Sequence, residues 1–123
     1  MTTKEKDWNL IHSYTAEQAV ADGALIEVHP DLRREAGYRW PVRIARGVAC
    51  LVTPSQEEVR QGQSLNGRLW DLLWMARIAI SNADSHEHIV SFDVTLGGRT
   101  PTLWACVDLT SGPAIHIIRP EDY

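Results

Sequence analysis

The residues whose types and spacing most resemble metal ligands lie in "ADSHEH", residues 83–88. His86 and His88 are two positions apart, so in an extended segment both side chains project to the same side, with Asp84 nearby. His116 would join them if the strands pair suitably. A zinc site needs three or four converging ligands, and a polar turn explains the same residues. One hypothesis is therefore a metal-dependent protein or small enzyme that uses Asp84, His86 and His88.

A second pair with chemical potential, His12 and Ser13, lies in "IHSYT". A serine nucleophile and a histidine base need the spatial geometry of a catalytic triad, which adjacent positions do not supply. Local hydrogen bonding and helix capping are the expected roles of Ser13 and Thr15. The sequence also lacks the Walker A, dinucleotide-binding, H-E-x-x-H and paired C-x-x-C motifs. We therefore expect no catalytic residues, no bound metal and no cofactor.

Composition and charge exclude several classes of protein. The chain has 123 residues, which suits one domain over residues 10–123 after a flexible lead-in of residues 1–9. A net charge of −4, with 12 basic and 16 acidic residues interleaved, is too mild for a phosphate-binding surface. We expect no direct contact with nucleic acid. Because no run of residues is apolar enough for a signal peptide or a membrane span, we expect a cytoplasmic protein without membrane contact.

The two cysteines, Cys50 and Cys106, lie in apolar runs. Such positions predict buried thiols in a reducing compartment, and a disulfide only if the fold brings the two residues together.

The N-terminal half contains several sequence signals for the starts and ends of helices. Thr15 with Gln18, and Ser55 with Glu58, have the spacing of capping boxes. The predicted elements are a helix over 16–22, a strand over 24–29, a short helix that starts at Pro30 and stops at Gly37, a helix over 41–52, and a helix over 66–81.

The longest predicted helix, in "GRLWDLLWMARIAI", carries two apolar stripes. One broad face is expected to pack on the sheet; it comprises Leu69, Leu72, Leu73, Ala76, Ala79 and Ile80. Trp70, Trp74 and Ile78 form a second stripe. Its cover is either internal, from the N-terminal helices, or external, from a second copy or another protein, and internal cover is the preferred expectation. Charge on the remaining surface is expected from Arg68, Asp71 and Arg77.

After residue 88 the hydrophobic period changes from 3.6 to 2. "IVSFDVTL", "TLWACVDL" and "AIHIIRP" alternate apolar and polar residues, separated by "GGRTP" and "TSGP" turns. The sequence therefore predicts an α+β fold. N-terminal short helices and one central apolar helix pack on a C-terminal three- to four-stranded antiparallel sheet, arranged as a meander.

Exposed charged residues are the candidates for binding a partner. Arg33 and Arg34 form the only tight basic pair, and neighbouring acids balance them, which is typical of a solvated helix face. The acids could compete for the basic groove of a nucleic-acid-binding complex. The candidate partner-binding residues are Asp31, Arg33, Arg34, Glu35, Glu57 and Glu58.

Four segments together resemble a family of small bacterial proteins with a domain of unknown function: "IHSYTAEQAVADGALIEV", "REAGYRWPV", "GRLWDLLWM" and "PAIHIIRPED". The resemblance runs from about Leu10 to Asp122, with departures in "HPDL" and over 53–64 and 81–101. It implies a gene typical of plasmids, phages and integrative elements. Small, acidic proteins from such elements are often inhibitors of host defences, including anti-CRISPR proteins.

Three hypotheses for function remain. The preferred one is a non-enzymatic protein that binds a host or element-encoded protein complex as an anti-CRISPR or other anti-defence factor. The second is the metal-dependent protein or enzyme built on Asp84, His86 and His88. The third is a homo-oligomeric structural or regulatory module, a homodimer whose interface is the stripe of Trp70, Trp74 and Ile78.

Overall fold

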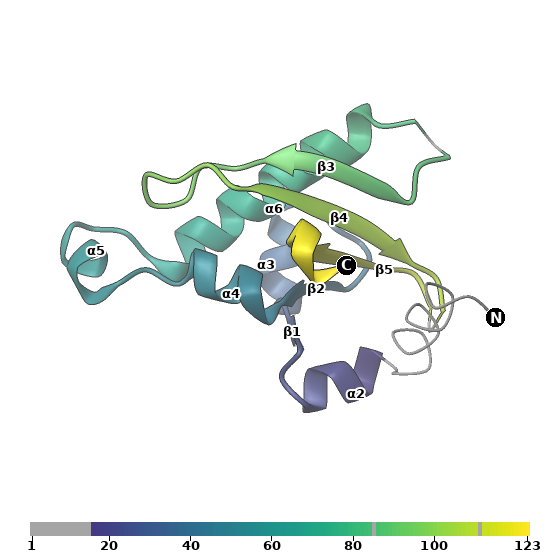
Figure 1. Ribbon diagram of the computed structural model, residues 1–123, viewed down its shortest axis with the longest axis horizontal. Coiled ribbons are helices and arrows are strands. Elements are labelled where there is room, and N and C mark those ends of the chain that lie inside the picture. Colours follow the sequence, from purple (N-terminus) through teal and green to yellow (C-terminus); the bar gives the residue numbers. More distant parts are fainter. Residues whose placement is uncertain (1–15, 85, 111) are drawn as a thin grey trace.

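The computed structural model describes residues 16–84, 86–110 and 112–123, and Figure 1 shows how its elements are arranged. The helices are α2 (Ala16–Ala21), α3 (Pro30–Glu35), α4 (Arg46–Val52), α5 (Gln56–Arg60) and α6 (Leu65–Asn82), with a 3-10 turn, η1 (Pro120–Asp122). The strands are β1 (Leu25–Glu27), β2 (Val42–Ala45), β3 (Ile89–Asp93), β4 (Thr102–Asp108) and β5 (Ala114–Ile118). The α+β class is therefore confirmed. The predicted lead-in of residues 1–9 and the His12–Ser13 pair lie outside the described residues.

The sheet of the described residues has five strands in the order β1-β2-β5-β4-β3. The antiparallel meander β3-β4-β5 was predicted, and its strands pair as expected. The expected sheet of three to four antiparallel strands is only roughly matched. The observed sheet is mixed, because β2 pairs with β5 in parallel and β1 adds to β2 in antiparallel orientation.

The predicted helix over 41–52 is wrong in its first part, because residues 42–45 form β2 and only residues 46–52 form a helix, α4. Apolar residues at helical spacing suggested one continuous helix, but Val42 and Ile44 also alternate with Arg43 as a strand requires. Both apolar side chains are buried in the hydrophobic core, and the backbone of the strand pairs with β1 and β5. Tertiary pairing on both edges of this segment thus decides its structure.

Local capping chemistry was predicted correctly at several helix ends. Ser55 Oγ accepts a hydrogen bond from Glu58 N, and the Glu58 carboxylate accepts one from Ser55 N, so this capping box is complete. Pro30 is the first residue of α3, and Gly37 follows that helix with φ +95°, a conformation that favours glycine. Thr15, the first residue of the other predicted capping box, lies outside the described residues.

Helix α6 lies along one face of the sheet (Figure 1). Leu72, Leu73 and Ala76 are fully buried there, as the helical period predicts. They share the core with inward-facing residues of the strands, including Leu103 and Ile117. In the described part of the chain, no helix has the length and apolar character needed to cross a bilayer.

Candidate functional site

The outward face of α6 carries the aromatic stripe singled out from the sequence. The rings of Trp70 and Trp74 stack with centroids 5.2 Å apart and planes 23° apart. The guanidinium of Arg77 lies 5.7 Å from the centroid of the Trp74 ring, a cation–π distance. Trp74 and Ile78 keep 40% and 39% of their surface exposed. The preferred expectation, that the N-terminal helices cover this stripe, is therefore wrong for these two residues.

Packing against the rest of the fold holds this aromatic face in place. The Tyr38 hydroxyl donates a hydrogen bond to the Leu73 carbonyl oxygen at 2.7 Å, and burial raises the pKa of that hydroxyl. A Cβ atom on Gly37 would lie 2.6 Å from Arg77 Nε, so the absent side chain makes room for the arginine over Trp74. The face thus combines exposed apolar side chains with a helix backbone that is fixed by its contacts with residues 37 and 38. We name it the aromatic face: Trp70, Trp74, Met75, Arg77 and Ile78.

Two of the predicted partner-binding acids, Asp31 and Glu35, lie on α3 and line a groove that is described below. Asp31 is exposed and lies 3.9 Å from the Arg34 guanidinium. Arg33 has a structural role, because its Nη1 donates hydrogen bonds to the carbonyl oxygens of Tyr38 and Arg39. The two arginines of the basic pair therefore face different partners.

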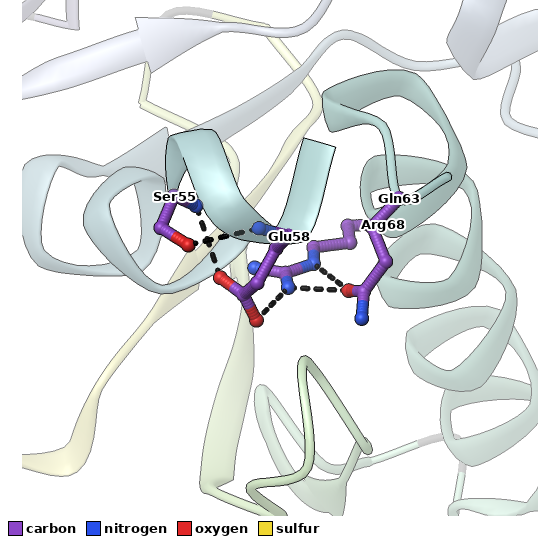
Figure 2. Close-up of polar contacts among 4 residues, drawn as sticks. All are labelled: Ser55, Glu58, Gln63 and Arg68. Atoms are coloured by element: carbon purple, nitrogen blue, oxygen red, sulfur yellow. Dashed lines mark hydrogen bonds and ion pairs between the residues drawn. The ribbon is translucent and has the colours of Figure 1, made fainter. Parts of the chain in front are cut away.

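The other two predicted acids, Glu57 and Glu58, lie on α5 and do not line that groove. Glu57 is exposed and pairs with Arg60 at 3.3 Å. The Glu58 carboxylate binds the Arg68 guanidinium (Figure 2), and the two groups are 2.5 Å apart. The hydrogen bond from Ser55 N and the Arg68 guanidinium hold the pKa of the Glu58 carboxyl below its usual value. Glu58 is therefore occupied within the fold.

The structure also corrects the expectation that Arg68 brings charge to the surface. Arg68 is 7% exposed, and its guanidinium binds both Glu58 and the side-chain oxygen of Gln63 (Figure 2). A Cβ atom on Gly97 would lie 2.5 Å from this guanidinium, so the β3–β4 hairpin closes over the ion pair. A hollow of about 430 Å³ between that hairpin and α4 and α5 is lined by this pair.

The histidine cluster of residues 83–88 does not gather metal ligands. The Asp84 carboxylate accepts a hydrogen bond from His86 N at 3.1 Å, which is the geometry of a turn. His86 and His88 are exposed, and His116 Nε2 is directed at Asp108 and Arg43. Within the described ranges, no three His, Cys, Asp or Glu side chains are placed to hold one metal ion.

A polar row that the sequence did not predict crosses the opposite face of the sheet. The strand registers align one residue from each strand. In sheet order these residues are Glu27, Arg43, His116, Cys106 and the apolar Ile89. Arg43 Nε lies 3.2 Å from the Glu27 carboxylate, without the angle of a hydrogen bond, and Arg43 Nη1 lies 3.4 Å from His116 Nε2. The alternation along β4 and β5 predicts that Cys106 and His116 face away from the core. Arg43 lies in line with them only because residues 42–45 form a strand.

Burial favours the neutral forms of two groups in this row, the Cys106 thiol and the His116 imidazole. Burial raises the pKa of the Cys106 thiol to about 11, so at neutral pH the thiol is protonated and a poor nucleophile. Burial also lowers the pKa of His116, against the opposing effect of Asp108. Cys50 is exposed, which contradicts the expectation of burial, and both cysteines are free thiols. The row therefore provides sheet packing rather than an activated Cys–His pair.

Comparisons of the chain with protein-family models, with curated proteins and with solved structures found no match.

Proposed function

We propose that this chain is a non-enzymatic binding protein that acts by protein–protein contact on a host defence complex, as an anti-CRISPR or other anti-defence inhibitor. The observation that carries the proposal is the aromatic face of α6. The resemblance to bacterial proteins from plasmids, phages and integrative elements supports the choice of a defence complex as the partner.

The composition of the aromatic face is that of a protein interface. Tryptophan, methionine and arginine are enriched in the cores of interfaces, and tryptophan and arginine dominate their binding energy. Trp74, Met75 and Ile78 are each more than a third exposed on a helix whose opposite side is fully buried. Because that buried side fixes the helix backbone, a partner would not have to order the helix, which lowers the entropic cost of binding.

The proposal is tested by expressing the chain in a bacterium with an active CRISPR–Cas system and measuring how efficiently a targeted phage forms plaques. We expect the chain to raise plaquing. We also expect a defence complex to be recovered with it and to bind it when both are purified. Trp74→Ala should weaken this binding by about 30-fold, which is the loss typical of a hot-spot residue.

Leu109→Ala is the matched control, because Leu109 is another exposed apolar residue and lies outside the aromatic face. It should bind and inhibit like the wild type. Equal inhibition by the Trp74→Ala variant would contradict the role of the aromatic face. An unchanged plaquing efficiency with the wild-type chain would contradict the anti-defence function. A dimeric mass in solution that Trp74→Ala converts to a monomer would assign the face to a second copy instead.

A further inference from the structure

A groove of about 440 Å³ lies between β1, α3 and the first turns of α6. Its apolar lining includes Ile26 and Ile44 from the sheet, Leu32 from α3 and Leu69 from α6. Ile26 is 41% exposed although its neighbour in the sheet, Ile44, is buried. The groove therefore presents apolar surface at the end of the sheet where β1 lies.

The strand beside this groove has a free edge. In the described part of the chain, β1 pairs with β2 on one side and with no strand on the other. Val28 N donates to Val42 O and Arg46 N donates to Ala24 O, so residues 24, 26 and 28 point their backbone groups at β2. By the alternation of antiparallel pairing, the N–H and C=O groups of Leu25 and Glu27 face outward. Such an edge can accept one more strand.

The polar residues around the groove give it a negative charge. Asp31, Glu35 and Glu27 line it, and no lysine or arginine does. The Glu27 carboxylate pairs with Arg43 at 3.2 Å on the opposite face of the sheet, so the charge of the groove comes from Asp31 and Glu35. Arg34 lies 3.9 Å from Asp31 and partly neutralises it. Glu35 is exposed and forms no ion pair with any described residue. The charge therefore favours a cationic occupant.

From these observations we propose that the groove binds an extended, cationic segment of a partner protein, which adds as a strand to the free edge of β1. Alternate side chains of the segment enter the apolar groove, and its lysine or arginine residues lie against Glu35 and Asp31. The backbone groups of Leu25 and Glu27 form the new hydrogen bonds. This inference is independent of the aromatic face, since none of the residues of that face lines the groove.

The probe is a display library of random short peptides, selected on the purified chain. We expect the enriched peptides to carry lysine or arginine between apolar residues. Their affinity should fall as salt increases, because partly exposed charges are screened. Glu35→Lys should weaken the binding of the best peptide by about tenfold or more. This exposed position ends α3, where a basic side chain is compatible with the helix.

The matched control is Glu57→Lys, the same charge reversal at an exposed acid on α5 outside the groove. It should leave peptide binding unchanged. Two N-methylated versions of the best peptide, modified at alternate positions, test strand addition: only the version whose methyl groups face β1 should lose affinity. Enrichment of uncharged or acidic peptides, failure to enrich any peptide, or equal effects of the two charge reversals would overturn the proposal. Equal binding of the two methylated peptides would overturn strand addition.

Discussion

Arg68 is a charged residue that the fold places in its interior. Its guanidinium lies next to the β3–β4 hairpin, where it donates hydrogen bonds to Glu58 and Gln63 (Figure 2). A buried charge is tolerated only when it is paired and hydrogen-bonded, and breaking such a pair leaves the other partner desolvated. The three residues therefore act as one unit that connects α5, α6 and the segment between them.

We predict that Arg68→Met and Glu58→Gln are non-additive in stability. Glutamine at position 58 keeps the capping box with Ser55 but removes the charge. Each single variant should lower the midpoint of thermal unfolding by several degrees, and the double variant should lose less than the sum. Thermal unfolding followed by circular dichroism in a double-mutant cycle measures this. Strictly additive losses would show that the ion pair contributes nothing of its own.

At the scale of elements, α6 has two apolar faces with different roles. Leu73 is buried in the core and 0% exposed to solvent, whereas Trp74, the next residue, is 40% exposed. Hydrophobic burial stabilises in proportion to the area removed from water, so the two faces contribute very differently to folding. Only the first face is needed to hold the helix on the sheet.

We predict that Leu73→Ala lowers the free energy of unfolding by about 2–5 kcal/mol, because it leaves a cavity in a packed core. Trp74→Ala should cost only about 1 kcal/mol, mainly through the loss of ring stacking on Trp70. Urea denaturation of both variants measures the difference. A comparable loss for the two residues would mean that the aromatic face is a folding element rather than a surface for binding.

At the scale of the whole molecule, the row across the sheet contains one aligned residue from each of the five strands. His116 sits in its middle, between Arg43 on β2 and Cys106 on β4. Because burial keeps the pKa of His116 below the ordinary histidine value of 6.5, the folded state favours the neutral imidazole. Below pH 6.5 the unfolded chain therefore binds a proton that the folded chain resists.

We predict that this residue makes stability depend on pH. The stabilisation is fully present above pH 6.5 and is lost as the pH falls from there through the lower pKa of the folded state. As the pH falls, the free energy of unfolding of the wild type should therefore decrease more than that of His116→Gln. His86→Gln, at an exposed histidine, is the control and should leave the slope unchanged. Urea denaturation from about pH 7.5 to about pH 5 covers this window. Parallel curves for wild type and His116→Gln would contradict the prediction.

The sequence by itself determined what depends on neighbouring residues. Capping at Ser55, the start of α3 at Pro30 and its stop at Gly37 follow from local hydrogen bonding and backbone sterics. The core face of α6 and the antiparallel meander follow from periodicity, because one face of each element must be buried. The exposure of the candidate acids Asp31 and Glu35 was predicted from the charged pattern of their short helix, and their role in binding stays a prediction.

Only the tertiary structure decided what depends on residues distant in the sequence. Residues 42–45 became a strand because β1 and β5 provide hydrogen bonds on both of its edges. Arg68 was buried because Glu58 and Gln63 lie within its reach. The exposure of Trp74 likewise depends on where the N-terminal helices pack. A pattern in the sequence shows that a side chain needs a partner, but distances between elements decide whether the chain itself supplies one.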